Sequence, residues 1–272
     1  SRKGPRFLLR DLIANRVFLD RDKASNVVVS AANIIYNYDY RELIRAHNES
    51  GADITLLTKT YSCEAEDVSS VYTEDGHVRG FTYGTRYGDE GFLDCFVVKR
   101  EKLIELIERY ANVDYLDLFE AIEPDLPQLD VRAHRVDMYT GSIFDARMYA
   151  KRSHEMLDSN VTAKLFPPDR PIMTKTHDNP PAKYESGARV TNSIVSGGCR
   201  IQGTVADSIL SRHVVIEPGA SVRDCVIMND CVIKRGARLE HAIIDRGNVI
   251  TAGTELRGTP EAVLVKEKGG ER

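Results

Sequence analysis

The sequence has few cysteines, no excess of positive charge and no long hydrophobic segment. Its five cysteines are odd in number and scattered, and most of them lie in apolar strand patterns: Cys63, Cys95, Cys199, Cys225 and Cys231. We therefore expect buried, reduced thiols in a cytoplasmic protein rather than a disulfide framework. Cys225 and Cys231 have neither CxxC spacing nor ordered histidine partners, which argues against a zinc site.

Charge and hydropathy exclude further classes of protein. The net charge of -4 lacks the basic excess that is usual in nucleic-acid-binding proteins. No apolar run reaches the length of a membrane span, and we expect no signal peptide. The sequence therefore predicts neither a nucleic-acid nor a membrane partner, and its 272 residues suffice for one large domain or two ordinary ones.

Four related segments near the C-terminus form the clearest pattern in the chain. They begin at Asn192, Asp207, Asp224 and His241, and the last three starts are 17 residues apart. Within each segment β-branched residues recur about every six positions, and a glycine recurs in every coil. A helix does not tolerate this composition well, whereas a parallel β-helix of hexapeptide repeats requires stacked coils of this kind.

The period also predicts which residues stack. Three columns take equivalent places in successive coils: Ile216, Ile233 and Ile250; Gly219, Gly236 and Gly253; and Val222, Leu239 and Leu256. We expect the isoleucine column to lie in the interior. The glycines suit corners that need a positive φ angle.

The preceding part of the chain alternates strand and helix patterns. Strands are expected at 27–30, 53–60, 77–83 and 91–99, and helices at 6–21, 40–48, 100–110 and 142–157. The first helix would place Leu9, Leu12, Ile13 and Val17 on one face. The alternation predicts a mainly parallel α/β sheet with helices on both faces. Residues 159–183 contain five prolines and are expected to form an extended linker.

Several stretches carry a resemblance to a known family. SAANIIYNYDYRELIRAHNESGADIT from Ser30, PIMT from Pro171 and PPAKY from Pro180 resemble parts of bacterial ADP-glucose pyrophosphorylases, which are glucose-1-phosphate adenylyltransferases. NSIVSGGCRIQG from Asn192 and HAIIDR from His241 resemble their β-helix. The SxxNI form in place of SGDHI is similar to the non-catalytic, GlgD-type subunit.

The resemblance implies an architecture of α/β followed by β. We expect a truncated nucleotidyltransferase-like (Rossmann-like) α/β domain over residues 1–158, the linker over 159–183 and a left-handed parallel β-helix over 184–272. The handedness comes from the family and not from the period. The family's glycine-rich nucleotide loop would precede Ser1, so we expect a region upstream of this sequence.

Departures from the family pattern decide the expected activity. Adenylyl transfer in the family uses magnesium held by carboxylates. The place of the first metal aspartate falls on Ala32, and Asn33 beside it is only a neutral ligand. The second metal motif corresponds to MYTGSIF from Met138, without an aspartate, and the glucose-1-phosphate lysine falls in FTYGT from Phe81. We therefore expect no cofactor bound by this chain.

The resemblance then implies that the chain is a regulatory, catalytically impaired subunit of the glucose-1-phosphate adenylyltransferase of glycogen biosynthesis. Its partner would be the catalytic subunit, in a hetero-oligomer expected to be a tetramer. Arg246 ends the IIDR motif, whose arginine is implied to bind an allosteric anion such as a sugar phosphate, and Lys266 and Lys268 in the tail are further candidate cations. An ordinary surface role for Arg246 remains open.

Other interpretations also remain open. The chain is alternatively an active nucleotidyltransferase of the same family, or a non-enzymatic scaffold such as the nucleotidyltransferase-like subunits of a translation-factor exchange complex. Asp39 is expected to be the N-cap of its helix rather than a replacement metal ligand. Asp145 is expected to be a first-turn carboxylate facing the helix dipole rather than a replacement for the lost aspartate. His213 and His241 are expected to be surface residues rather than the base of an acyltransferase.

Overall fold

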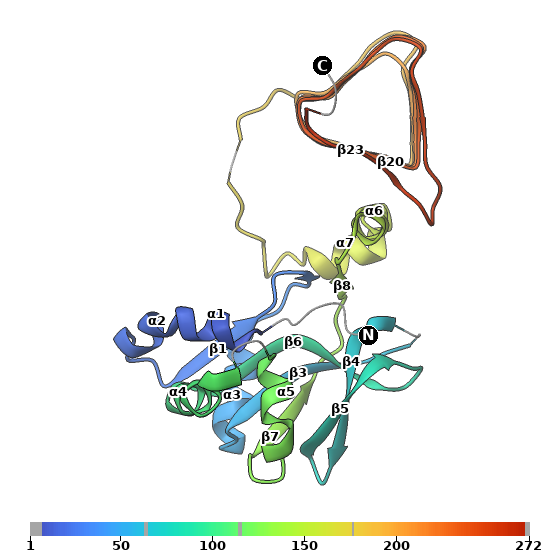
Figure 1. Ribbon diagram of the computed structural model, residues 1–272. Helices are drawn as coiled ribbons and strands as arrows, with labels where there is room; N and C mark the ends of the chain where they lie inside the picture. Colours follow the sequence, from blue (N-terminus) through green and yellow to red (C-terminus); the bar gives the residue numbers. More distant parts are fainter. Residues whose placement is uncertain (1–6, 63–64, 114–115, 176, 270–272) are drawn as a thin grey trace. The chain divides into compact units, whose positions relative to one another are not determined.

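The computed structural model describes residues 7–62, 65–113, 116–175 and 177–269 (Figure 1). The chain divides into two compact units, Ser1–Thr140 and Gly141–Arg272. This division lies earlier than the expected boundary at residue 158. The reason is that helix α6 (Ala146–Glu155) packs Ala150 against Val226 and Ile243 on the outside of the β-helix. No helix within the described ranges is both long enough and apolar enough to cross a membrane.

The first unit is built on a six-stranded sheet in the order β1-β6-β3-β7-β5-β4. Its strands are β1 (Asn26–Ser30), β3 (Ile54–Thr60), β4 (Ala65–Glu74), β5 (His77–Thr85), β6 (Glu90–Lys99) and β7 (Val131–Arg135). A separate short strand, β2, covers Ile34–Ile35. The sequence patterns had predicted β1, β3, β5 and β6 but neither β4 nor β7.

The expectation of a mainly parallel sheet is wrong. Among the described residues of this sheet only β3 and β7 pair in parallel, and the other pairings are antiparallel. The turn between β4 and β5 consists of Asp75 and Gly76, with φ angles of 49° and 78°. Two residues with positive φ form a tight hairpin, and a hairpin can only join antiparallel strands.

Helices cover both faces of the sheet, as expected. They are α1 (Leu9–Ala14), α2 (Arg16–Arg21), α3 (Tyr40–Ser50), α4 (Arg100–Arg109) and α5 (Leu118–Ile122), with 3₁₀ turns η1 (Ala111–Val113) and η2 (Glu123–Asp125). Leu43 of α3 packs with Leu57 and Cys95, whereas Leu106 of α4 packs with Leu56 and Phe96. Since consecutive strand residues point to opposite faces, the two helices lie on opposite sides of the sheet (Figure 1).

Helix α3 follows its expected capping signals closely. The Asp39 carboxylate accepts a hydrogen bond from the Arg41 backbone N–H at 3.0 Å, and Gly51 ends the helix with a φ angle of 71°. The helix expected over residues 6–21 is instead broken at Asn15 into α1 and α2. Leu9 is buried but Val17 is 42% exposed, so the predicted continuous apolar face does not form.

The second unit begins with β8 (Gly141–Ser142), α6 and α7 (Ser159–Leu165). Helix α7 occupies the first part of the expected extended linker, and Asp158 caps it by accepting from the Asn160 backbone N–H at 2.8 Å. The helix is possible because the prolines begin only at Pro167. From Phe166 to Ala182 the described residues form no helix or strand.

A parallel β-helix follows, and its overlying coils have a triangular outline in Figure 1. Each side of the triangle is a five-stranded parallel sheet. The first contains β10 (Arg189–Thr191), β13 (Thr204–Ala206), β16 (Ser221–Arg223), β19 (Arg238–Glu240) and β22 (Glu255–Arg257). The second contains β11 (Ile194–Val195), β14 (Ile209–Leu210), β17 (Val226–Ile227), β20 (Ala242–Ile244) and β23 (Leu264–Lys266). The third contains β9 (Lys183–Tyr184), β12 (Arg200–Ile201), β15 (Val215–Ile216), β18 (Val232–Ile233) and β21 (Val249–Ile250).

The predicted columns are confirmed. Ile216, Ile233 and Ile250 pair in register and are at most 4% exposed. The three corner glycines have φ angles of 77°, 70° and 71°. Four cysteines are free and buried, and burial raises the pKa of Cys225 to about 12, which keeps that thiol protonated. The fifth, Cys63, lies outside the described residues.

Candidate functional site

Strands β1, β3 and β7 run in the same direction, since β6 lies antiparallel between β1 and β3 and β3 pairs with β7 in parallel. In α/β proteins ligands bind beyond the carboxyl ends of such strands. Ala32 and Asn33 form a turn directly after β1, where the Ala31 backbone N–H donates to the Asp94 carbonyl at 2.9 Å. The two residues at the degenerate metal position thus lie at the edge where a site is expected.

Tyrosine hydroxyls and a thiol lie beside this turn. Ser30 Oγ hydrogen-bonds with the Tyr36 hydroxyl at 2.8 Å, which in turn meets the Tyr40 hydroxyl at 3.1 Å. Burial raises the pKa of Tyr36 and also that of the Cys95 thiol beside it, so both stay protonated at neutral pH.

These residues do not fit a magnesium ion. Ala32 has no ligand atom and Asn33 offers only a neutral amide, whereas magnesium is usually bound through carboxylates and phosphates. Within the described ranges no three His, Cys, Asp or Glu side chains are grouped so as to hold a metal.

Polar residues that the sequence patterns did not single out lie farther along the same edge. The Tyr38 hydroxyl is 3.1 Å from His134 Nε2, and burial lowers the pKa of His134. Glu90 accepts from Thr58 Oγ1 at 2.5 Å and from Arg135 Nη2 at 2.8 Å. In the sequence, the only sign that these residues could belong to a site is their position near strand ends. That sign can be used only when the directions of the strands are known.

The other two family motifs also lack their charged groups. Phe81, where the resemblance places the lysine motif, packs its ring 5.4 Å from Phe119 and 6.2 Å from Phe92. The stretch from Met138 lies close to β3, because Lys59 Nζ donates to the Met138 carbonyl at 2.5 Å. The backbone of this stretch is thus held by a cation from the protein itself.

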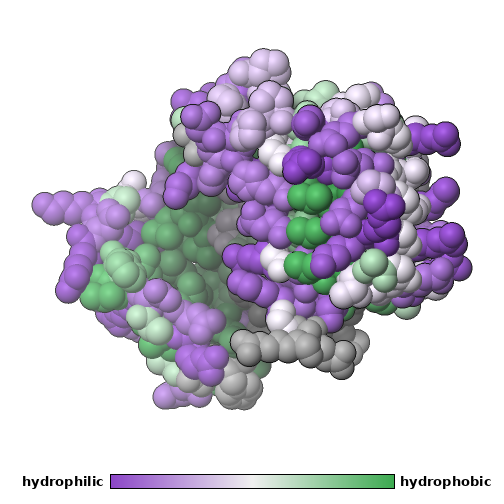
Figure 2. Space-filling view, turned by 90° about the horizontal axis from the view of Figure 1, so that it is seen from above, coloured by the Kyte–Doolittle hydropathy of each residue, from purple (hydrophilic) through white to green (hydrophobic). Residues whose placement is uncertain are grey.

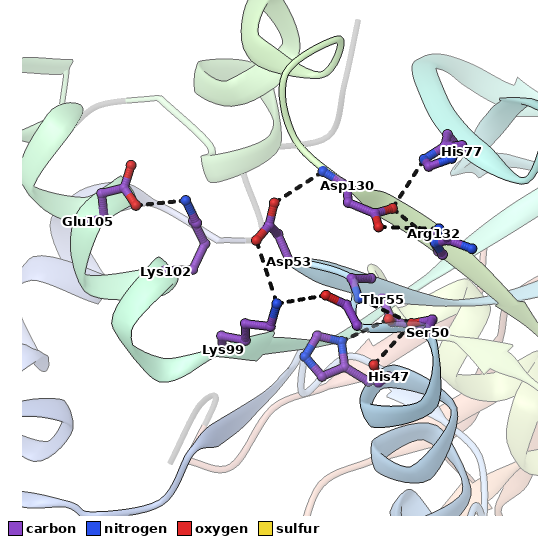
Figure 3. A network of polar contacts seen from close by, with 12 residues as sticks. His47, Ser50, Asp53, Thr55, His77, Lys99, Lys102, Glu105, Asp130 and Arg132 are labelled. Atoms are coloured by element: carbon purple, nitrogen blue, oxygen red, sulfur yellow. Dashed lines mark hydrogen bonds and ion pairs between the residues drawn. The ribbon is translucent and has the colours of Figure 1, made fainter.

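A separate polar network occupies the opposite ends of β3 and β7 (Figure 3). Asp53 accepts from the Asp130 backbone N–H at 3.1 Å, and its other oxygen is 3.9 Å from Lys99 Nζ. Asp130 lies 2.9 Å from Arg132 Nε and 3.1 Å from His77 Nδ1. Burial alone would raise the pKa of Asp130, but Arg132 and His77 outweigh burial and lower it. This network joins strand ends, and no expected site residue lies in it.

The candidate anion-binding residues of the second unit lie on two chain segments near Asp245. Arg246 follows β20 and Lys266 ends β23, with Ile244 and Lys266 paired in register. The Asp245 carboxylate accepts from the backbone N–H groups of Arg246 at 2.7 Å and Lys268 at 3.3 Å. The Arg246 side chain is 71% exposed and its Nε is 4.0 Å from Asp245. The backbones of Arg246 and Lys268 are therefore joined through the Asp245 carboxylate, which lies beside the exposed Arg246 side chain.

Asp145 is the N-cap of α6 rather than a residue of its first turn, since α6 begins at Ala146 and the Asp145 carboxylate accepts from the Met148 backbone N–H at 2.7 Å. His213 is hydrogen-bonded at both ring nitrogens, to Asp230 Oδ1 at 3.1 Å and to Asn179 Oδ1 at 2.9 Å. A Cβ atom added at Gly198 would lie 2.2 Å from the His213 ring. Gly198, the second glycine of the SGGC motif, therefore leaves space for the His213 ring, which hydrogen-bonds to Asn179 in the linker.

Comparison with known proteins agrees with this architecture. Residues 180–262 match a family model described as GlmU-like, C-terminal hexapeptide. The chain is 29% identical over 252 residues to the glycogen biosynthesis protein GlgD of Bacillus subtilis (strain 168), covering 93% of this chain and 65% of that protein. It is 30% identical over 202 residues to the GlgD protein of Geobacillus stearothermophilus, covering 74% of this chain and 50% of that protein.

A glucose-1-phosphate adenylyltransferase of Thermomicrobium roseum is also similar. It is 30% identical over 238 residues, which cover 78% of this chain and 56% of that enzyme. The chain thus spans less than two thirds of the length of each of these relatives. The resemblance to GlgD proteins and ADP-glucose pyrophosphorylases, inferred from the sequence motifs, is confirmed, and it connects the chain with proteins of glycogen biosynthesis.

Proposed function

We propose that this chain is part of a regulatory, catalytically impaired subunit of a glucose-1-phosphate adenylyltransferase of glycogen biosynthesis. The complete enzyme makes ADP-glucose and pyrophosphate from ATP and glucose 1-phosphate. The observation that carries the proposal is the turn after β1, which is formed by Ala32 and Asn33. The family resemblance implies a metal-binding aspartate at this place. We propose that the chain binds no magnesium and acts by pairing with a catalytic subunit.

The chemistry of the reaction supports an impaired site. Adenylyl transfer develops negative charge on phosphate oxygens, and that charge must be neutralised by cations held in place beforehand. Ala32 supplies no ligand for such a cation. Phe81 lies in the apolar cluster with Phe92 and Phe119, where a lysine amine would be needed to bind a sugar phosphate.

The surface of the β-helix supports a role in assembly. Val215, Val232 and Val249 form one outward-facing column of the third sheet, and Val249 is 52% exposed. Figure 2 shows a short hydrophobic row of this kind on the otherwise hydrophilic outer surface of the β-helix. Exposed apolar patches with polar surroundings are typical of protein–protein contact sites. We propose this column as a contact for the catalytic subunit.

The cations around Asp245 support a role in regulation. A guanidinium group binds phosphate through two parallel hydrogen bonds, and Arg246 is exposed and therefore accessible. Lys266 and Lys268 lie on the neighbouring chain segment. In this proposal a sugar-phosphate effector bound by these residues alters the activity of the catalytic partner.

The test is the synthesis of ADP-glucose by the full-length protein that contains this chain. Three samples are compared: this protein alone, a catalytic subunit alone, and the two after co-expression. We expect no turnover from the first and an altered response to sugar phosphates in the third. Robust magnesium-dependent turnover by the first sample would support the active-enzyme alternative. Co-purification without any change in activity would support the scaffold alternative.

A further inference from the structure

A small cavity of about 60 Å³ lies within the first unit, where β5 meets α5 and η2. Strand β5 lines it with Phe81 and Tyr83, and the helical segment lines it with Phe119, Glu120 and Glu123. Sites for whole small molecules usually measure about 300–1,000 Å³. This cavity is much smaller, and its size suits the end of a single long side chain from another protein.

The floor of the cavity is aromatic. Phe92 and Phe119 are 2% and 4% exposed, and their ring centroids lie 5.1 Å apart. The Phe81 ring lies 5.4 Å from that of Phe119 and 6.2 Å from that of Phe92. Because the three rings pack against one another, the floor is fixed in place. Such a floor favours apolar carbon chains, and the face of an aromatic ring also attracts a cation.

The rim of the cavity is acidic. Glu120 and Glu123 are three residues apart, so they lie on the same side of the helical segment. The Glu120 carboxylate is held in place, because it accepts from the Tyr83 hydroxyl at 3.2 Å and from the Asp117 backbone N–H at 3.3 Å. The Glu123 side chain is exposed and makes no hydrogen bond or ion pair with another described residue. None of the described residues that line the cavity is cationic.

An aromatic floor beneath an acidic rim selects the chemistry of the group that fits. A phosphate or a carboxylate would be repelled by the two glutamates. A wholly apolar side chain would cover the rings but would leave Glu123 without a counter-ion. An arginine side chain satisfies both parts, because its methylene groups pack on apolar surface while its guanidinium group pairs with carboxylates and stacks on aromatic rings.

We propose that this cavity receives an arginine side chain from the basic surface of a partner protein. The methylene groups would lie against Phe81 and Phe119, and the guanidinium group would pair with Glu123. Tyr83, which is 60% exposed, would form the outer wall of the contact. Arginine is among the residues that contribute most to the stability of protein–protein interfaces when it fills such a pocket. The contact is separate from the valine column of the β-helix, and it requires no particular identity of the partner.

The test is a nuclear magnetic resonance titration of the full chain, labelled with ¹⁵N at its phenylalanines. The probes are three peptides, acetyl-Gly-X-Gly-amide, in which X is arginine, lysine or citrulline, the uncharged analogue of arginine. We expect the arginine peptide to shift the backbone amide signals of Phe81 and Phe119. It should bind at least about tenfold more tightly than the citrulline peptide, and also more tightly than the lysine peptide. The signal of Phe18, which lies outside the cavity, should not move.

Variants separate the contributions of charge and ring. Glu123→Gln removes only a charge, and Phe81→Leu removes a ring but keeps an apolar side chain; each should weaken binding of the arginine peptide about fivefold. Glu49→Gln is the matched control, because Glu49 is exposed on α3 outside the cavity, and it should leave binding unchanged.

Three results would overturn the proposal. The first is that the arginine peptide does not shift the signals of Phe81 and Phe119. The second is that the citrulline or the lysine peptide binds as tightly as the arginine peptide. The third is that Glu123→Gln binds the arginine peptide like the unmodified chain. Unchanged positions of the phenylalanine signals from outside the cavity establish that each variant is folded.

Discussion

Replacing Ile233 with aspartate tests the register of the β-helix most directly. Ile233 is fully buried and lies between Ile216 and Ile250 in the interior column. Loss of the isoleucine side chain from such a position costs about 2–5 kcal/mol. Burial of a carboxyl group without hydrogen-bond partners costs about 1–3 kcal/mol more. The sum is comparable with the whole free energy of unfolding of an ordinary domain, about 5–15 kcal/mol.

The assay is urea denaturation followed by far-ultraviolet circular dichroism, because the chain has no tryptophan to serve as a fluorescent reporter. We expect Ile233→Asp to abolish the cooperative unfolding of the β-helix, since each coil is stabilised by its neighbours. Val249→Asp is the matched control, because Val249 lies in the same sheet but is 52% exposed. If both variants unfold at the same urea concentration, the assignment of interior and exterior columns is refuted.

Three further outcomes are expected. Burial lowers the pKa of both His47 and His134, so the unfolded chain binds more protons than the native chain as the pH falls below about 6.5. The free energy of unfolding should therefore decrease from pH 7 to pH 5. A constant value over this range in urea titrations would contradict this expectation. Gly198→Ala should lower the melting temperature, because the added Cβ would lie 2.2 Å from the His213 ring. The double variant with His213→Ala should recover part of the loss, and absence of that recovery would argue against the contact. The third variant is Arg246→Ala in the full-length protein, paired with an effector-insensitive catalytic subunit. It should weaken activation by sugar phosphates about tenfold or more. An unchanged activation constant would show that Arg246 is an ordinary surface residue.

The sequence predicted those features that depend on short-range patterns. The β-helix and its columns follow from a repeat in which each coil contacts only its neighbours, so the spacing of Ile216, Ile233 and Ile250 is itself the packing rule. Asp39 and Asp145 were recognised as helix-terminal carboxylates because a cap is made within a few residues of the chain. That Ala32 cannot ligate a metal also follows from the sequence alone, because a metal ligand requires a donor atom, which alanine lacks.

Features that depend on contacts between distant segments required the tertiary structure. Strand direction in the first unit is one example, since β6 returns between β1 and β3 and no local pattern specifies that order. The assignment of α6 to the second unit is another, because Ala150 could equally have faced a sheet of the first. The cavity lined by β5 and α5 brings Phe81 together with Phe119 and Glu123, which are far from it in sequence. Amphipathic spacing specifies which side of a helix is apolar, but the surface that covers that side is selected by the packing of the whole chain.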